Sequence, residues 1–270
     1  MPDAKLPLAL QLSTLVTRAE SGDPVAVCRL AVGASRCRDE LRKRKFNDSV
    51  MRALESKSTE LDGLMINNAA MTEERLAQSG DYCADVDIDS LPSINEVLRQ
   101  HQVLSPRQKV VVTMTRPDGQ LRRLHGGASY SEGAYLIFPQ VIADHGYEFL
   151  LEGVRAREPL ALEALLMIHA PGKAIPSQGM NLALPNPRLF LKYGGLMHEL
   201  FGEQALEGPA SRLLQEAVKT LPAAEIERIG RDVESEASRW RQAHNPSARE
   251  SLSDWDPRRL SDTDQDSCAP

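Results

Sequence analysis

The sequence has few aromatic residues and no long apolar run. Phe, Trp and Tyr make up only 4% of its 270 residues, whereas β-sandwiches and barrels use strands rich in aromatic and β-branched side chains. No segment approaches the roughly 18 to 20 apolar residues that a membrane-spanning helix needs. These two absences favour packed helices over an aromatic-rich β fold, and they predict no membrane span.

Cysteine is also scarce and lacks the spacing of a metal site. The four cysteines form no C-x-x-C pair, and none has a histidine nearby in sequence, so no zinc site is expected. A disulfide from Cys83 to Cys37 or Cys28 would tie the excursion over residues 38–80 to the N-terminal segment. Reduced cysteines in a cytosolic protein are the alternative. Because three of the four cysteines lie near one end of the chain, we favour an oxidising compartment.

Basic residues are not in excess. The chain has 32 Lys and Arg against 38 Asp and Glu, a net charge of −6 at pH 7, so no overall positive field would attract a phosphate backbone. A basic run over residues 36–45 is interrupted by Asp39 and Glu40, and we interpret it as a solvated helix face or loop. No nucleic-acid partner is predicted.

One sequence phrase occurs twice, 135 residues apart (158 − 23). An acidic residue and a proline precede the pattern Φ-Ala-Φ-x-x-Leu, where Φ is apolar, first over residues 23–30 and again over residues 158–165. Each phrase follows an amphipathic stretch, and an acidic residue before a proline is typical of a helix start. The sequence therefore predicts two antiparallel helical hairpins, over residues 6–34 and 134–170.

Much of the remaining sequence has helical spacing. The apolar stretch Leu6–Val16 contains polar residues and precedes no cleavage site, which favours a packed first helix over an export signal. Further helices are predicted over residues 47–70, from 72 onward, and over 93–100, 187–200, 209–220 and 222–243, several of them with a proline in the first turn. The expected fold class is mainly α, an irregular set of antiparallel helical hairpins.

Residues 109–124 depart from this pattern. The run Val110-Val111-Val112-Thr113-Met114-Thr115 is rich in β-formers, Pro117-Asp118-Gly119 is a turn signal, and alternation returns over residues 120–124. We interpret this segment as an inserted β-hairpin, with an irregular helix as the alternative. The predicted domains are a helical region with the cysteine-bearing hairpin (1–105), a β-hairpin and loop (106–133), a helical-hairpin region (134–243) and a polar, disordered tail (244–270).

The helix joint within residues 18–31, Arg-Ala-Glu-Ser-Gly-Asp-Pro-Val-Ala-Val-Cys-Arg-Leu-Ala, resembles the joint of Sel1-like repeats, which are TPR-related. In those repeats a helix ends in an Ala, acidic, Gly, Asp run and the next continues from Ala to Leu. Residues 150–165 are similar, with Arg157-Glu158 in place of Gly-Asp. The chain also resembles uncharacterised envelope proteins of gamma-proteobacteria with Sel1-like segments. These resemblances imply a protein-binding scaffold in the periplasm, favoured over the cytoplasm.

Histidines are where we look for catalysis near neutral pH, and none lies in a recognisable motif. His198-Glu199 begins a zinc-protease pattern, but Gly202 stands where the second histidine is needed. His169 ends an apolar run and is expected to be a satisfied buried histidine.

An enzymatic alternative places a hydrolase site between His125, in the loop after the predicted hairpin, and the helix bearing Asp144 and His145. Because those residues match no known catalytic spacing, we predict instead a non-enzymatic scaffold or adaptor that binds a protein or peptide. An inhibitor or immunity-type protein is a variant of that prediction. No catalytic, metal or cofactor-binding residue is assigned, no cofactor is expected, and no oligomeric state is specified.

Overall fold

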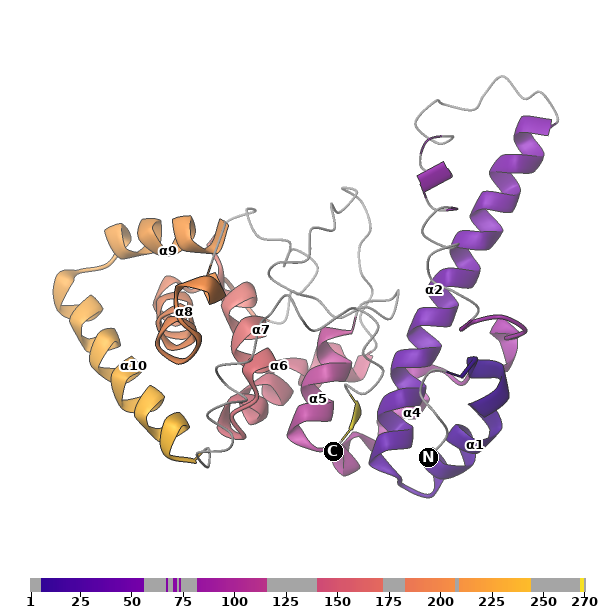
Figure 1. Ribbon diagram of the computed structural model, residues 1–270, viewed down its shortest axis with the longest axis horizontal. Coiled ribbons are helices and arrows are strands. Elements are labelled where there is room, and N and C mark those ends of the chain that lie inside the picture. The colour runs from indigo at the N-terminus through magenta and orange to yellow at the C-terminus, as the bar shows by residue number, and fades with distance from the viewer. Residues whose placement is uncertain are drawn as a thin grey trace. The chain divides into compact units, whose positions relative to one another are not determined.

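The computed structural model describes residues 6–55, 67, 70–71, 73, 82–115, 140–171, 183–206, 209–243 and 268–269 (Figure 1). These residues are mainly helical and contain no β-strand. None of the helices among them is both long and apolar enough to cross a bilayer. The chain forms two compact units: unit 1 comprises residues 1–108, 115–121 and 265–270, and unit 2 comprises residues 109–114 and 122–264.

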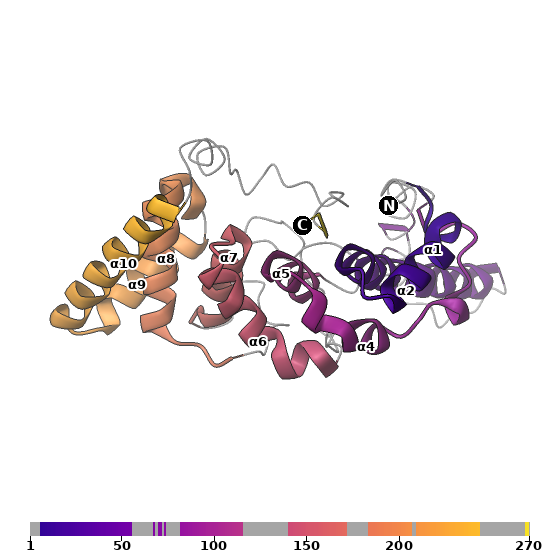
Figure 2. The same ribbon diagram turned by 90° about the horizontal axis from the view of Figure 1, so that it is seen from below.

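Unit 1 is built on a hairpin of two helices, α1 (Leu8–Glu20) and α2 (Pro24–Glu55), which pack side by side (Figure 2). The Asp23 carboxylate starts α2, because it accepts hydrogen bonds from the backbone N–H groups of Val25 and Ala26 at 3.0 and 3.2 Å. Leu8 and Leu15 of α1 are buried against the partner helix. The hairpin is thus held by the Leu and Ala stripes of its two helices.

Helix α2 is much longer than its predicted end near residue 34. It continues to Glu55 because the sequence beyond Ala34 contains no proline or glycine and is rich in Arg, Lys and Leu, which favour helices. The basic run lies on this helix, where Arg44 pairs with Glu40 at 2.7 Å. Arg38 extends from α2 to the backbone oxygens of Leu91 and Pro92 at 2.6 and 2.7 Å, which attaches the next segment to the helix.

That next segment is short and irregular. It consists of η1 (Ile88–Ser90), α4 (Ile94–Val97) and η2 (Leu98–Val103), all close to α2. The Glu96 carboxylate accepts a hydrogen bond from the backbone N–H of Ser93, so the first turn of α4 is capped from within.

The two sequence phrases have the same backbone geometry at their joints. Gly22 and Arg157 both adopt a positive φ, +83° and +65°. In each joint the backbone N–H of this residue donates to the carbonyl three residues back. The backbone N–H of the next residue, Asp23 or Glu158, donates to the carbonyl five residues back, and all four distances are 2.9 to 3.0 Å. This is the Schellman arrangement of a helix C-terminus. The repeated phrase therefore marks a repeated turn, although Glu158, unlike Asp23, makes no side-chain cap.

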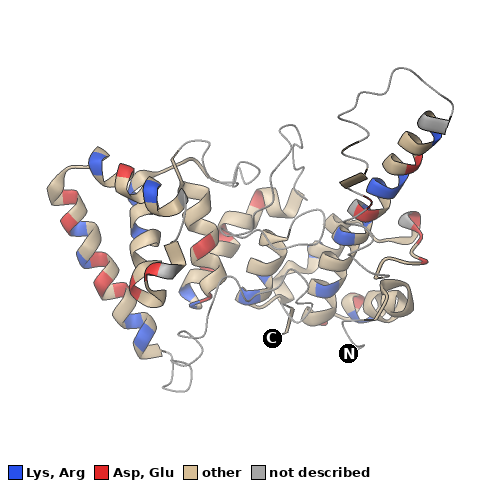
Figure 3. Ribbon diagram, turned by 45° about the horizontal axis from the view of Figure 1, so that its top comes forward, with Lys and Arg blue, Asp and Glu red and all other residues tan. Residues whose placement is uncertain are grey.

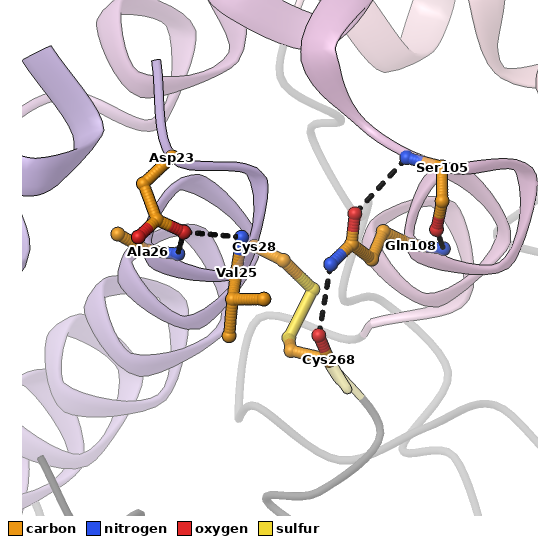
Figure 4. The surroundings of a disulfide bond; sticks show 7 residues. All are labelled: Asp23, Val25, Ala26, Cys28, Ser105, Gln108 and Cys268. Carbon is orange, nitrogen blue, oxygen red and sulfur yellow. Dashed lines mark hydrogen bonds between the residues drawn. A yellow bond between two sulfur atoms is a disulfide. The ribbon is translucent and has the colours of Figure 1, made fainter. Parts of the chain in front are cut away.

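Two disulfides cross unit 1. Cys37 is bonded to Cys83, one of the two pairings that the sequence left open. Cys28 is bonded to Cys268, a partner that sequence analysis did not consider because it placed residue 268 in a disordered tail. Both sulfurs of this bond are buried, and Gln108 donates from Nε2 to the Cys268 carbonyl at 2.8 Å (Figure 4). The chain thus returns to unit 1 after forming unit 2.

The predicted β-hairpin is wrong over its described residues. Residues 106–114 form helix α5 (Pro106–Met114), and residues 116–124 lie outside the described residues. Ser105 and Gln108 form a capping box, in which each side chain bonds to the other residue's backbone N–H at 3.0 to 3.3 Å. The valine run is buried within this helix, so burial and a strong helix start outweigh β-propensity.

Unit 2 contains α6 (Gln140–Arg155), α7 (Pro159–His169), α8 (Pro187–Phe201), η4 (Glu203–Leu206), α9 (Pro209–Thr220) and α10 (Ala223–Ala243). Helix α7 packs against both α6 and α8, and every residue from Ala161 to His169 is buried. Asn186 caps α8 by accepting from the N–H groups of Arg188 and Leu189, as its sequence position predicts. Helices α9 and α10 each pack on α8.

Candidate functional site

Helices α8 and α10 run side by side in the same direction. An ion pair joins the start of α8 to the start of α10, from Arg188 Nε to Glu225 Oε1 at 2.7 Å. A second ion pair joins their ends, from Arg241 Nη2 to Glu199 Oε2 at 3.1 Å. Helix α9 lies between them in sequence, follows η4 and packs on α8 (Figure 1).

A pair of glycines in α8 lets both neighbouring helices approach closely. A Cβ added at Gly194 would lie 2.5 Å from a methyl carbon of Leu214 on α9, and one at Gly195 would lie 3.2 Å from Val233 on α10. Carbon atoms do not approach this closely without something shifting. The Gly194-Gly195 pair is therefore explained by packing inside the chain, with one glycine for each neighbour.

A groove of about 920 Å³ lies between α8, α9 and α10. Its lining on α8 extends from Leu191 to Glu199, about 12 Å along the helix axis. Val218 of α9 lines it with 41% of its surface exposed. The lining as a whole comprises Leu191, Gly194, Gly195, His198, Glu199, Glu203, Leu206, Ser211, Arg212, Leu214, Gln215, Val218, Gly230, Val233 and Glu234.

The two ends of the groove differ in chemistry. Leu191 lies on α8 about one turn before the Gly194-Gly195 pair. Gly230 precedes Val233, which meets Gly195, by one turn of α10. Because the two ion pairs give α8 and α10 the same direction, Gly230 lies toward the Leu191 end of the groove. The opposite end, at the C-terminus of α8, carries the polar or charged side chains of His198, Glu199, Glu203 and Arg212. One end is thus apolar and the other is polar.

Gly230 differs from the glycines of α8 because no described neighbour requires it. A Cβ added there would meet no atom of the described residues within 4 Å, and the residue is exposed in the middle of a 21-residue helix. Glycine at such a position costs about 1 kcal/mol relative to alanine. A glycine also allows another backbone to approach closely. The open space beside Gly230 is part of the groove.

Of the residues named for the hydrolase alternative, the structure describes Asp144 and His145, which are consecutive on α6. Asp144 accepts a hydrogen bond from Gln140, one turn earlier on α6, at 2.8 Å. His145 lies 3.9 Å from the Glu148 carboxylate and stacks on Phe149 of the same helix. His125 lies outside the described residues. The predicted meeting of His125 with Asp144 and His145 therefore stays a prediction.

His169 is a satisfied buried histidine, as predicted. Its Nδ1 lies 3.2 Å from the Leu184 carbonyl, which can only accept, so Nδ1 carries the proton and Nε2 accepts from the Tyr147 hydroxyl at 3.0 Å. Its backbone carbonyl also accepts from Asn186, and its ring stacks on Tyr193. His169 therefore joins the end of α7 to the segment that leads into α8.

Burial sets the ionisation of the His169, Tyr147 and Tyr193 side chains. It lowers the pKa of His169 below its usual 6.5, although the hydrogen bond to Leu184 acts in the opposite direction. Burial and the nearby Tyr147 raise the pKa of Tyr193 to about 12, and burial also raises the pKa of Tyr147. All three side chains are consequently neutral at pH 7.

This cluster predicts a loss of stability in mild acid. A histidine whose folded pKa lies below 6.5 stabilises the fold fully above that pH, and the contribution falls as pH drops below 6.5 toward the folded pKa. Urea unfolding followed by tryptophan fluorescence should show a lower midpoint at pH 5 than at pH 7.5. His169→Gln should flatten this dependence, whereas His198→Gln, on the exposed side of α8, should preserve it. An unchanged slope in His169→Gln would contradict the assignment.

The groove contains no evident catalytic arrangement. Within the described residues, neither His198 nor Ser211 hydrogen-bonds to another side chain of the lining, and Glu199 pairs with Arg241. No cluster of three or more His, Cys, Asp or Glu suited to a metal ion occurs in that part of the chain. Sequence analysis singled out His198 and Glu199 only as a failed metal motif. The available signal was Gly230, a glycine inside a strongly amphipathic helix.

Comparison with protein-family models, curated proteins and solved structures finds no match to this chain.

Proposed function

We propose that this protein is a non-enzymatic binding protein and that the α8–α9–α10 groove holds a polypeptide segment of its partner. One observation carries the proposal. Gly230 leaves an open, accessible space on the groove wall that no described part of the chain fills. A partner whose backbone or small side chain approaches α10 there would account for a glycine that is otherwise unfavourable in a helix.

The dimensions of the groove support a short segment. A length of about 12 Å accommodates roughly two turns of helix. Leu191, Leu214 and Val218 offer apolar contacts along it, which is how grooves between helices recognise amphipathic peptides. A partner would engage it with two or three apolar side chains.

The organisation and compartment predicted from sequence belong to this proposal. The matching joints at Gly22 and Arg157 support a Sel1-like arrangement of helical hairpins, a class that binds proteins. The two buried disulfides support an oxidising compartment such as the periplasm.

Filling the groove tests the proposal. Gly230→Phe places a ring in open space, so the fold should persist while the groove is blocked. The probe is a phage-displayed library of random 16-residue peptides selected on the wild-type protein. Selected peptides should bind Gly230→Phe about 10-fold more weakly, a loss of roughly 1.4 kcal/mol. Trp240 fluorescence and circular dichroism would verify that the variant is folded.

The matched control is Ser235→Phe, which adds the same ring to an exposed position of α10 that does not line the groove. It should leave peptide binding unchanged. Peptides that bind Gly230→Phe as tightly as the wild type would place the binding surface elsewhere, and a library that yields no enriched sequence would contradict peptide binding.

A further inference from the structure

We infer that the segment bound in the groove is a cationic amphipathic one, with its apolar side chains at the Gly230 end and a Lys or Arg at the Glu203 end. This inference rests on the proposed function and adds the chemistry and orientation of the occupant. It follows from the charges of the lining, the backbone at the C-terminus of α8 and the difference between the two ends of the groove.

Acidic groups outnumber basic ones in the lining. Three glutamates line the groove against one arginine, Arg212. Glu199 is occupied by its ion pair with Arg241. Glu203 and Glu234 are exposed and make no ion pair or side-chain hydrogen bond with the described part of the chain, so both carboxylates remain available to a ligand. A bound Lys or Arg would find acceptors there, whereas a bound carboxylate would meet repulsion.

The backbone adds partial negative charge at the polar end of the groove. Glu199 and Glu203 lie at the C-terminus of α8, where carbonyl groups without helical partners carry a partial negative charge. Two of them are occupied, because the Gly202 N–H donates to the His198 carbonyl at 2.8 Å and the Arg241 guanidinium donates to the Glu199 carbonyl. Helix dipole and carboxylates therefore act in the same sense, toward a cation at this end.

The other end favours apolar groups. Leu191 and Gly230 are uncharged, and Val218, which is 41% exposed, adds an apolar side chain to the lining. Along α10, the Arg residues are interspersed with Asp and Glu over most of its length (Figure 3). The groove thus matches a segment whose apolar and basic residues are separated along its length.

Three synthetic peptides of 16 residues test the inference by fluorescence anisotropy. They share four leucines at helical spacing and differ at two positions near one end, which are Lys, Gln or Glu. The Lys peptide should bind about 5-fold more tightly than the Gln peptide, and the Glu peptide should bind most weakly. The preference should vanish in 500 mM salt, where charges on a surface are screened within roughly 4 Å.

The variant Glu203→Gln should bind the Lys peptide about 3-fold more weakly than the wild type does and bind the Gln peptide equally well. Glu227→Gln, which removes a glutamate of α10 outside the groove lining, is the control and should change neither. Equal binding of all three peptides, each lost in Gly230→Phe, would overturn the charge preference and leave the proposed function standing. No binding by any peptide, or binding that persists in Gly230→Phe, would overturn both.

Discussion

Removal of the Cys37–Cys83 disulfide, by replacing both residues with alanine, should lower the free energy of unfolding of unit 1 by about 3 to 4 kcal/mol. The bond joins residues separated by 46 positions, and closing a loop of that size restricts the unfolded chain by about this amount. Both residues are buried, at 0% and 3% exposure, so alanine avoids placing a new hydroxyl in the core.

The measurement can separate the two units. Both tryptophans of the sequence, Trp240 and Trp255, fall in the residue range of unit 2. In urea unfolding followed by circular dichroism at 222 nm, the double variant should be less stable than the wild type. The midpoint of the transition reported by tryptophan fluorescence should not change. A double variant as stable as the wild type by both probes would mean that the bond contributes nothing to the fold.

The second disulfide provides the comparison. Cys28 and Cys268 are 240 positions apart, but the entropy of loop closure grows only with the logarithm of loop length. The closed ring also includes all of unit 2, whose own fold restricts the chain while unit 1 unfolds. We therefore expect the double variant Cys28→Ala with Cys268→Ala to lose no more free energy of unfolding than the variant that lacks the Cys37–Cys83 disulfide. Thiol titration in denaturant should find no free thiol in the native protein, since the described cysteines are all bonded.

Much of the helical architecture was predictable because its start signals are local. Asp23 with Pro24 and Asn186 with Pro187 combine a capping side chain with a proline that needs no hydrogen bond, and both begin helices where the sequence indicates. The Schellman turn at Gly22 could be anticipated from glycine, and the same turn at Arg157 could be anticipated only by analogy with the repeated phrase.

The errors arise where distant contacts decide the outcome. Residues 110–112 are β-branched, yet they are buried inside α5, and the Ser105–Gln108 capping box that announces this helix was overlooked in favour of the turn signal that follows. The partner of Cys28 lies 240 residues away, beyond a polar segment that suggested disorder. No local pattern could supply that pairing.

The groove was invisible to motif analysis for a different reason. Its lining comes from three helices and one short turn, and almost none of its residues belongs to a catalytic or metal-binding pattern. What makes it a groove is the packing of α9 and α10 on the two glycines of α8. Spacing along the chain indicates which face of each helix is apolar but does not show where two faces leave space between them.

Two glycine-to-alanine substitutions should therefore have opposite effects on the stability of unit 2. Gly153 of α6 faces α7, and a Cβ there would lie 2.8 Å from the Cβ of Ala161 and would also meet the Val110 side chain. Because the Ala161 Cβ is fixed to its backbone, the helices would have to separate. Gly153→Ala should cost about 2 kcal/mol, the overpacking penalty less the gain in helix propensity.

Gly230→Ala is the matched substitution, since the same methyl group enters open space in another helix of the same unit. It should stabilise unit 2 by about 0.5 to 1 kcal/mol, because only the helix propensity changes. Urea unfolding followed by tryptophan fluorescence, which reports on unit 2, measures both variants against the wild type. A stable Gly153→Ala would show that α6 and α7 do not meet at Ala161, and a destabilised Gly230→Ala would show that the wall of the groove is already occupied by the chain itself.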